Sequence, residues 1–537
     1  MKILGIQVPF TAKAETQETK PTPQARTYVG SWGRGYAVSF DGEKNFGEIG
    51  PVIQYELDFD ALRLRSWESY LTNDISKTVL DKFSAWIIGQ GLKLQSHPLK
   101  HLLQKQGVDL ELEDLTHHIE ARFKAWAKSK HSSFNQMTNL NRIARNTLKH
   151  GKIGGDAVVV LRLKNGIVNV QMIDGEHLRG DLTLNPADGN TIKNGIECDA
   201  TGKHIRYFIA KKGGGHTVIE CINKTTGLVQ AFMYYGNQYR EDENRGFPII
   251  GSSLETLKKI DRYKEAAVGS AEERQKISYF IEHMLGSDGS NPFAEQIARA
   301  INVDSENGKG MPIDDYSQQL AKNIVSTSNK QTYNLTPGST IKAVDSRQEL
   351  FFEEFYKTNA NIICASIGIP PNVAFSLYTD SFSASRAATK DWEHTMNVER
   401  DDFQFQFYQR VYDFWLHFEV LSGRINIDGY LEAFYAKDFI TLEAFRNARF
   451  TGAQFPHIDP LKEVQAERLK LGDSAKSIPL TTVEMATEAL NGGDSFANIE
   501  QFADELQDAI ERNITYDPTK VVSNTRGGLQ ERGEQED

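Results

Sequence analysis

The sequence predicts an α+β protein with long helices, and three observations lead to this fold class. Up to about residue 150, apolar side chains recur at helical spacing, and from Asp156 to about Tyr239 the pattern changes to that of strands. Two long helical runs follow, separated by a segment rich in turn-forming residues. Since a domain holds roughly 100 to 200 residues, we expect about three structural units in this chain.

An N-terminal arm and three helices are predicted before the strands. Residues 1–30 form the arm, because the stretch TAKAETQETKPTPQARTYVG is polar and rich in Pro and Thr. In the first helix Ile75, Val79 and Phe83 recur at helical spacing, and Gly89 supplies a natural stop. Two further helices are expected to pack on the strands, at about residues 111–130 and 138–150.

The strand region has the pattern of two hairpins in an antiparallel sheet. Its first stretch, DAVVVLRLKNGIVNVQMID, has apolar runs on both sides of Asn165-Gly166, a dipeptide typical of a two-residue hairpin turn. The stretch GIECDATGKHIRYFIAKK repeats this scheme, with its turn near Thr201-Gly202. We therefore expect one antiparallel sheet flanked by helices.

Residues 252–285 are predicted to form a helix of about 34 residues, near 50 Å long at 1.5 Å per residue. Leu254, Leu257 and Ile260 open its apolar stripe, and the stretch AAVGSA in the middle offers only small side chains. The stripe is closed by Ile277, Phe280, Ile281 and Met284. A helix of this length needs packing from the same chain or from another subunit.

A small unit and a second long helix are predicted to follow the first long helix. Residues 287–345 are rich in Gly, Asn, Ser and Asp, and we predict a small protruding unit with one short helix and two strands around Pro337-Gly338. A second helix returns from this unit within residues 346–369.

Pro370 and Pro371 end the returning helix, because proline lacks an N–H donor and fixes φ. The stretch NVAFSLYTDSF that follows mixes aromatic, hydroxyl and acidic residues, which fits a catalytic loop, a lid or a loop that lines a ring. A helix of up to about 40 residues is predicted from Ser383 toward Leu421, with Ser383 or Ser385 as its cap. One face of this helix is apolar and is expected to be core: Phe403, Phe407, Val411, Phe414, Trp415 and Phe418.

Three shorter helices are predicted in the C-terminal part, before a tail that we expect to be disordered from about Tyr516. The first is opened by Asp459-Pro460, an N-cap followed by proline at the first helical position. A capping box from Thr481 to Glu484 opens the second. The third carries Phe496, Ile499, Leu506 and Ile510.

Composition excludes several classes of protein. With 39% apolar and 25% charged residues the chain resembles globular proteins, no apolar stretch reaches the ~20 residues of a membrane span, and no signal cleavage site is evident. Cys198, Cys221 and Cys364 lie far apart, which favours buried thiols in a cytoplasmic protein. A net charge of −11 argues against a protein that coats nucleic acid, though not against one that lets DNA pass.

No enzyme motif is complete in the sequence. The stretch SENGKGMP lacks the hydroxyl residue of a phosphate-binding loop, neither HExxH nor GxSxG occurs, and the glycine clusters do not form a dinucleotide fingerprint. A metal needs three or four converging ligands, and each candidate group supplies at most two: His117 with His118, Asp391 with His394, and His457 with Asp459. We therefore predict no enzymatic activity, no cofactor and no metal site.

Seven stretches, in this order, resemble the portal proteins of tailed bacteriophages, in the lambda-type family. They are SYLTNDISKTVLDKFSAWIIGQGLKLQ, VQMIDGEHL, GIECDATGKHIRYFI, ENRGFPIIGSSLETLKKIDRYKEAAV, LTPGSTIKAVD, IICASIGIPPNVAFSLYTDSFSASRAA and PHIDPLKEVQAERLKLG. The likeness covers about residues 60–515. The stretch SLYTDSFSASRAA departs from the Asn-Tyr-Ser-Ser-like sequence toward which the family tends.

This resemblance implies a portal fold with wing, stem, clip and crown, assembled into a ring. The implied division is a flexible arm (1–30), an α+β wing (31–251), a first stem helix (252–286), a clip (287–345), a second stem helix (346–369), a tunnel loop (370–383), a long helix that completes the wing (384–455), a helical crown (456–515) and a flexible tail (516–537).

The resemblance also implies a function without enzymatic activity. The expected ring, of twelve copies, lies at one capsid vertex of the virion and is the channel for packaging and ejection of double-stranded DNA; the subunit is made in the host bacterial cytoplasm. Its expected partners are the terminase large subunit, the major capsid and scaffolding proteins, and a head-tail adaptor, with no membrane and no cofactor. Another virion adaptor or minor capsid protein is the alternative, and a metal-dependent DNA-processing enzyme would require three converging acidic or His ligands.

Within that framework the loop hinge is Pro370 and Pro371, and the tunnel loop is expected to face the DNA. The residues implied are Asn372, Ser376, Tyr378, Thr379, Ser381, Ser383 and Arg386. Hydroxyl groups and few charges touch passing phosphates weakly, which suits movement of DNA better than a cluster of lysines would. Arg386 and Lys390 are expected to add modest attraction beside an otherwise acidic lumen.

Overall fold

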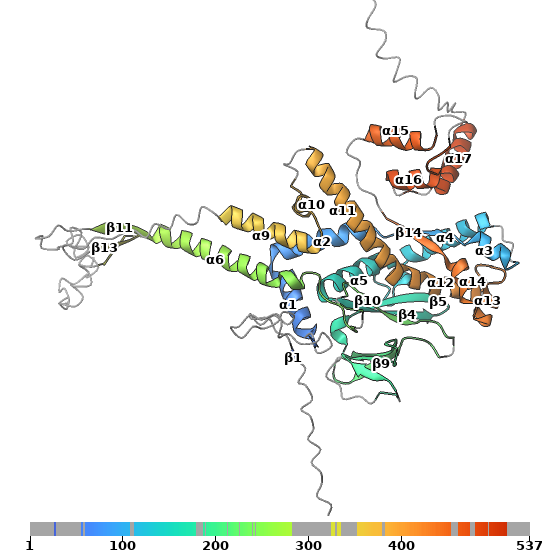
Figure 1. The fold of residues 1–537 in the computed structure, drawn as a ribbon, viewed down its shortest axis with the longest axis horizontal. Helices are drawn as coiled ribbons and strands as arrows, with labels where there is room; N and C mark the ends of the chain where they lie inside the picture. Colours follow the sequence, from blue (N-terminus) through green and yellow to red (C-terminus); the bar gives the residue numbers. More distant parts are fainter. Residues whose placement is uncertain are drawn as a thin grey trace, which may run out of the picture. The chain divides into compact units, whose positions relative to one another are not determined.

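The computed structural model describes most of the chain between residues 59 and 512. The described residues are 26–27, 55–56, 59–107, 112–178, 186–187, 189–211, 213–224, 226–238, 240–241, 243–281, 324–327, 330–334, 352–377, 382–452, 460–472, 478–491, 493 and 495–512. The chain divides into two compact units (Figure 1). The first comprises Met1–Asp58, Glu68–Lys77 and Ile250–Ile367, and the second comprises Phe59–Trp67, Thr78–Ile249 and Gly368–Asp537.

The first unit is built on two antiparallel helices, α6 (Leu254–Lys276) and α9 (Phe352–Ile367). Just before α6, Ser253 Oγ lies 2.7 Å from Oγ of Ser366, near the end of α9. Farther along α6, the ring of Tyr263 stacks on that of Phe352 at the start of α9, with centroids 5.6 Å apart. The two helices therefore run in opposite directions, which confirms the predicted return of the chain.

Helix α6 is shorter than predicted, and its expected extension to residue 285 is wrong. It ends at Lys276, and Ile277–Ile281 form strand β11, parallel to β13 (Lys330–Asn334). Strand β12 (Ile324–Thr327) pairs with β13 in the antiparallel sense. The stretch ISYFI consists largely of β-branched and aromatic residues, which favour a strand. The predicted turn at Pro337-Gly338 lies outside the described residues.

The first predicted helix is interrupted at Asn73, between α1 (Phe59–Thr72) and α2 (Asp74–Ile88). Asn73 Oδ1 accepts hydrogen bonds from the backbone N–H groups of Ile75 (3.0 Å) and Ser76 (3.1 Å), so this residue caps α2. Its Nδ2 donates to Asp261 on α6 (2.8 Å). Helix α2 ends one residue before Gly89, at the stop that the sequence predicted.

The second unit contains a three-stranded antiparallel sheet in the order β10-β4-β5, with bounds Ala231–Tyr235, Asp156–Lys164 and Ile167–Asp174. The predicted hairpin turn between β4 and β5 is present, because Asn165 and Gly166 both have positive φ values, 54° and 71°. Helix α5 (Leu140–Gly154) packs against all three strands.

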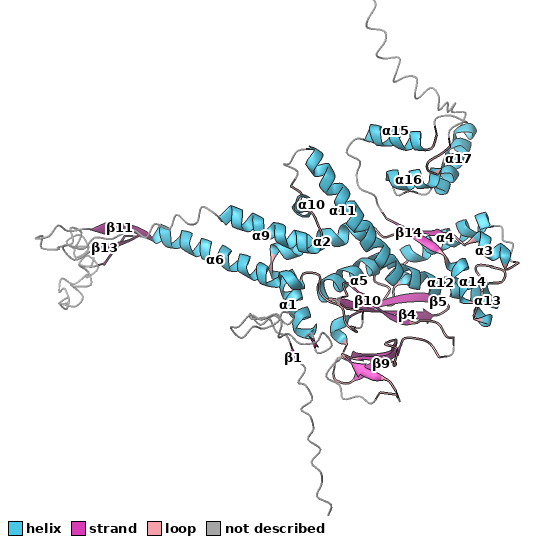
Figure 2. Cartoon of the chain, in the orientation of Figure 1, coloured by secondary structure: helices cyan, strands magenta, loops and turns pink. Residues whose placement is uncertain are grey.

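A second sheet corrects the expectation of a single one. Its four antiparallel strands, in sequence order, are β6 (Thr191–Lys193), β7 (Ile196–Cys198), β8 (His204–Ala210) and β9 (His216–Glu220). Val158 and Val160 of β4 share a core with Ile196 and Tyr207 of this sheet, so the three-stranded sheet lies between helices and a second sheet (Figure 2). The continuous apolar run AVVVL is typical of such a strand, which is buried on both faces.

The predicted 40-residue helix is present as one continuous rod. It comprises α11 (Phe382–Phe403), a π-helical segment η7 (Gln404–Gln409) and α12 (Arg410–Leu421). Its predicted core residues Phe403, Phe407 and Trp415 are buried. Trp415 lies edge-on to Phe123 of α4 (Leu112–Lys128), with ring centroids 5.1 Å apart.

Shorter elements complete the second unit. Near the long helix lie the antiparallel pair β3 (Lys93–Ser96) and β14 (Ala448–Thr451), with α3 (Lys100–Lys105), α13 (Tyr430–Ala436) and α14 (Phe439–Arg446). The three predicted C-terminal helices are present as α15 (Pro460–Lys470), α16 (Val483–Asn491) and α17 (Ser495–Glu511). The cap of α16 is Thr482, whose Oγ1 accepts from Met485 N (3.2 Å), one residue later than predicted.

Candidate functional site

The loop between α9 and α11 is the site that the sequence analysis singled out, and its first half is tightly built. Gly368 follows the last residue of α9 with φ of +83°, a left-handed conformation that ends helices and favours glycine. Pro370 then takes an extended conformation, and its carbonyl oxygen accepts from the backbone N–H of Ala374 (2.9 Å). The change of direction therefore begins at Gly368, two residues before the predicted hinge.

A short helix, α10 (Pro371–Phe375), occupies part of the segment predicted as open loop. Proline at the first helical position needs no N–H partner, so Pro371 starts this helix instead of only ending the previous one. Val373 and Ala374 are buried, which anchors α10 in the second unit. Of the predicted lining residues, Asn372 lies in this anchored helix, and its carbonyl oxygen accepts from Leu377 N (3.0 Å).

Ser376 is the point at which the anchored part of the loop ends. It adopts a left-handed conformation with φ of 57°, and its side chain is exposed. Its Oγ accepts a hydrogen bond from Lys82 Nζ of α2 (3.0 Å). Lys82 was missed by the sequence analysis, because nothing in the pattern of α2 indicates which loop its exposed face meets.

The remaining predicted residues are only partly described. Tyr378, Thr379 and Ser381 lie outside the described residues, as do the side chains of Ser383 and Arg386. Helix α11 begins at Phe382, so Ser383 and Ser385 lie in its first turn and are not its N-cap, which corrects the predicted cap. The ammonium group of Lys390, expected to attract DNA, forms an ion pair with Glu393 (2.6 Å).

A buried ionic cluster lies at the start of β4. Asp156 is fully buried and accepts hydrogen bonds from Arg245 Nε (2.8 Å), from the Gly246 backbone N–H (2.8 Å) and from the guanidinium group of Arg63. Burial by itself raises the pKa of Asp156, but the charges of Arg245 and Arg63 outweigh it and hold the pKa below its ordinary value. The carboxylate is therefore ionised and joins α1 and the segment before α6 to the sheet.

Asp174 extends this cluster at the end of β5. Its Oδ1 accepts from Arg63 Nη1 (2.9 Å), and its Oδ2 lies 2.5 Å from His150 Nδ1. Burial opposes ionisation, yet the hydrogen bond with His150 and the charge of Arg63 lower the pKa of Asp174 to about 2. Gly175 leaves room for these groups, because a Cβ there would lie 1.8 Å from Asp156 Oδ1. The close ion pairs among these buried side chains indicate a structural cluster.

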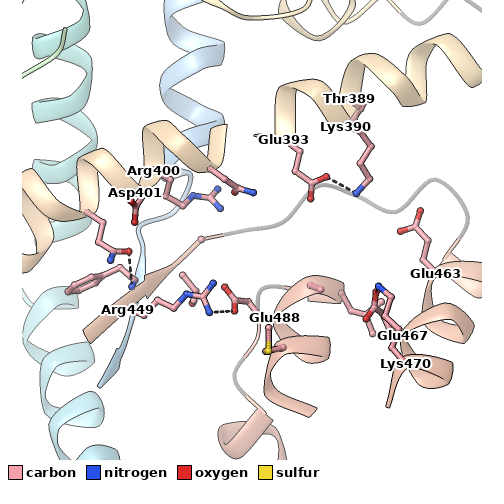
Figure 3. Close-up of a pocket in the computed structure, with 18 of the residues that line it drawn as sticks. Thr389, Lys390, Glu393, Arg400, Asp401, Arg449, Glu463, Glu467, Lys470 and Glu488 are labelled. Carbon is pink, nitrogen blue, oxygen red and sulfur yellow. Dashed lines mark hydrogen bonds and ion pairs between the residues drawn. The ribbon is translucent and has the colours of Figure 1, made fainter. Parts of the chain in front are cut away.

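A cavity of about 720 Å³ lies between α11, the end of β14 and the helices α15 and α16 (Figure 3). Its charged side chains are largely paired with one another: Arg449 with Glu488 (2.7 Å) and Lys470 with Glu467 (2.6 Å). Arg400 points its guanidinium group at the end of α2 and donates to the carbonyl oxygen of Ile87 (3.0 Å). The Arg449–Glu488 ion pair joins α16 to β14, and the paired charges do not form a catalytic arrangement.

Within the described residues, no group of three or more His, Cys, Asp or Glu side chains is placed to hold a metal ion. Among those same residues, none of the helices combines the length and the apolar character that a membrane crossing requires.

The geometry thus defines an α+β chain with two antiparallel helices, α6 and α9, and an anchored loop between α9 and α11. Residues 53–400 match the family model described as phage portal protein, lambda family. Since the match spans more than half of the chain, this protein belongs to the lambda family of phage portal proteins.

Individual relatives are distant. The probable portal protein of Halomonas phage phiHAP-1 is 24% identical over 403 residues, which cover 72% of this chain and 71% of that protein. Two solved chains come from the neck of an empty gene transfer agent (GTA) particle and from the virion of a native GTA particle. The first has a TM-score of 0.39 and 12% identity, and the match covers 83% of this chain and 95% of the solved chain. The second has a TM-score of 0.40 and 11% identity, and the match covers 84% of this chain and 95% of the solved chain. We base the family membership on the sequence match alone.

Proposed function

We propose that this chain is the subunit of a closed ring of twelve copies at one capsid vertex of a phage virion, with an axial channel for packaging and ejection of double-stranded DNA. Membership in the portal family carries this proposal. The role is structural and needs no cofactor. The terminase large subunit docks on the ring during packaging, and a head-tail adaptor replaces it afterwards.

The C-terminal helices support assembly with further copies. Among the described side chains of residues 460–512, Ala486 is the one apolar residue that is buried, whereas Leu469, Ile499 and Ile510 are each at least 60% exposed. Helices held by so little internal burial gain stability when neighbouring copies cover their apolar faces. A contact of one face with a different face of the next copy generates a ring when the rotation closes.

The antiparallel helices α6 and α9 are the proposed stem, and the strands β11 to β13 belong to the proposed clip. In this assignment the tunnel loop follows the second stem helix and lines the channel through Asn372, Ser376, Tyr378, Thr379, Ser381, Ser383 and Arg386. The anchored helix α10 supports this role, because a fixed base holds a loop in place while DNA passes. The hydrogen bond from Lys82 to Ser376 adds a second point of support.

The ring is tested by electron microscopy of the purified full-length chain. We expect closed rings that, viewed along the symmetry axis, have an opening wide enough for a DNA duplex, about 20 Å. A chain that stays monomeric under every assembly condition, or that stacks without a central opening, contradicts the proposal.

The tunnel loop is tested by deleting residues 376–381. We expect the variant to assemble into rings of normal size and to fail in packaging or retention of DNA. A variant that packages DNA as the wild type does would remove the role of the loop and leave the ring proposal intact.

A further inference from the structure

A second cavity, of about 760 Å³, lies within the second unit, away from the tunnel loop and from the pocket of Figure 3. One wall comes from the four-stranded sheet and from β10, and the other comes from the π-helical segment η7, α12 and the end of α14. We name it the sheet–helix pocket. The chain brings charged side chains into it from both walls, and two of these have unused hydrogen-bond donors.

Arg410, the first residue of α12, is the central group of the sheet–helix pocket. Its guanidinium carbon lies 5.0 Å from the centre of the Phe232 ring. Within the described residues the side chain of Arg410 forms neither a hydrogen bond nor an ion pair, and burial lowers the pKa of its guanidinium group. Stacking uses one face of the group and leaves its five in-plane N–H donors available. A half-buried cation without an acceptor is costly unless a ligand or water supplies one.

Arg446, at the end of α14, brings a second guanidinium group to the same cavity. Its Nε donates to the Tyr430 hydroxyl (2.9 Å), but its Nη2 is buried without a hydrogen-bond partner. Asp413 also lines the cavity and accepts from Gln409 Nε2 (2.8 Å), while among the described residues no ion pair joins it to either arginine. Arg410 thus presents unmet donors to this space, and Arg446 adds a second positive charge beside it, while its unpartnered Nη2 is itself shielded from solvent.

The opposite wall supplies neutral polar groups. His204 Nδ1 lies 2.9 Å from the Tyr207 hydroxyl, and His204 Nε2 lies 3.3 Å from the Tyr235 hydroxyl. Burial, and then the positive charge of Arg410, lower the pKa of His204, so its imidazole is neutral at pH 7. This wall therefore offers polar contacts without competing for the cations.

Apolar side chains also line the sheet–helix pocket and remain exposed. Phe405 of η7 is 68% exposed, and Val229 is 45% exposed. A ligand that carries an apolar group next to its charged group would cover both surfaces. From the unmet arginine donors and this apolar rim, we propose that the sheet–helix pocket binds a carboxylate attached to an apolar group, as in an acidic side chain next to an aromatic one in a peptide segment.

The charge balance favours a carboxylate over a phosphate. Both groups fit the planar donors of arginine. The cavity is also lined by Asp402 and Glu241, which offset two of the three positive charges of Lys203 and the two arginines, whereas burial raises the pKa of Asp413 to about 7 and so favours its neutral form. A ligand with a single negative charge is therefore better matched than a dianion. An acidic peptide segment and a small organic carboxylate share this chemistry, and the experiment separates them.

The test uses the full-length assembled chain and ligand-observed NMR titration with matched probes. Phenylacetate is compared with phenylacetamide, and the capped peptide Gly-Glu-Phe-Gly with Gly-Gln-Phe-Gly; each second member lacks only the charge. We expect each carboxylate to bind at least about 10-fold more tightly than its amide, since a charge-assisted hydrogen bond is lost. A preference shown by the peptide alone identifies a protein segment as the ligand, and one shown by phenylacetate alone identifies a small carboxylate.

Variants then place the binding in this cavity. Arg410→Gln should weaken carboxylate binding about 10-fold and leave amide binding unchanged, whereas Arg142→Gln, at an exposed position on α5, should change neither. Equal binding of carboxylate and amide by the wild type would overturn the proposal, even if Arg410→Gln did not fold. An Arg410→Gln protein that folds and keeps the preference would also overturn it. Neither result bears on ring formation.

Discussion

The aromatic core around the long helix and the three C-terminal helices are held together in opposite ways. Around Trp415 and Phe123, rings from α4, α12 and β14 are buried and contact one another at centroid distances of 5.1 to 6.2 Å. In α15, α16 and α17 the described apolar side chains other than Ala486 are not buried, and the ion pair Arg449–Glu488 joins α16 to strand β14.

This difference indicates that the aromatic core is stabilised within a single copy, whereas the C-terminal helices depend on contacts with further copies for much of their stability. Burial of apolar surface contributes roughly 25 cal/mol per Å², so the aromatic core needs no partner, whereas the C-terminal helices gain little within one chain. Exposed ion pairs contribute at most about 1 kcal/mol each. We therefore expect substitutions in the core to change the stability of the single chain, and substitutions in the C-terminal helices to change assembly.

The largest effect is expected for Asp156→Asn. The substitution leaves the buried guanidinium group of Arg245 without a charged acceptor and Arg63 with Asp174 alone, and breaking such a cluster costs about 3 to 5 kcal/mol. Urea denaturation of the unassembled chain measures the change in free energy of unfolding. Asp401→Asn is the control, because Asp401 is exposed on the long helix and should cost under about 0.5 kcal/mol. Equal stability of the two variants would show that the cluster adds nothing.

Trp415→Ala is expected to be nearly as destabilising. Trp415 is 1% exposed and packs against Phe123 and Tyr412, so the substitution leaves a cavity that costs about 3 to 5 kcal/mol. The matched change in the C-terminal helices is Ile499→Ala, at a side chain that is 60% exposed. In the unassembled chain it should cost under about 0.5 kcal/mol. The same denaturation experiment compares them, and similar losses would refute the contrast between the two regions.

Asp413 makes the region around α12 sensitive to pH. Burial raises the pKa of this carboxyl to about 7, from an ordinary value near 3.8. The neutral form is thus favoured in the folded chain, so its contribution to stability is complete below about pH 4 and is lost as pH rises to 7. Asp413→Asn removes this loss and should gain at most about 4 kcal/mol at pH 8 relative to wild type. Unfolding at pH 4, 6 and 8 measures it, and parallel curves for the two proteins would contradict the assignment.

The sequence was sufficient for elements with a strong period or a specific turn. Helical spacing predicted α2 and the long rod through Trp415, and Asn165-Gly166 predicted the β4–β5 hairpin, because these signals depend on neighbouring residues alone. The residues of strand β11 were predicted to be helical, because an apolar run of five residues fits the period of a helix as well as that of a strand. Only its pairing with β13, which is distant in the sequence, determines that it forms a strand. The division of the strands into two sheets likewise depends on contacts between segments far apart in the chain.

The position of the loop between α9 and α11 could be predicted from the sequence, but its conformation could not. Pro370 and Pro371 marked its position, whereas the short helix α10 and the burial of Val373 and Ala374 require knowledge of the surrounding side chains. The sequence also does not indicate which side chains from different helices and strands contact one another. Lys82 lies 294 residues from Ser376 in the sequence. Arg410 lies in the long helix, whereas Phe232, which it contacts, lies in a strand of the sheet.

The smallest effect is expected where helix α16 meets strand β14. Arg449→Gln removes the ion pair with Glu488. The side chain of Arg449 is 57% exposed, so solvent and salt already screen this interaction. The free energy of unfolding of the unassembled chain should fall by under about 1 kcal/mol, and the difference should vanish at 1 M salt. Limited proteolysis between β14 and α15 reports local opening, with Arg142→Gln as the control. A loss as large as that of Trp415→Ala, persisting in high salt, would mean that one copy does fix these helices and that their apolar faces need no neighbouring subunit.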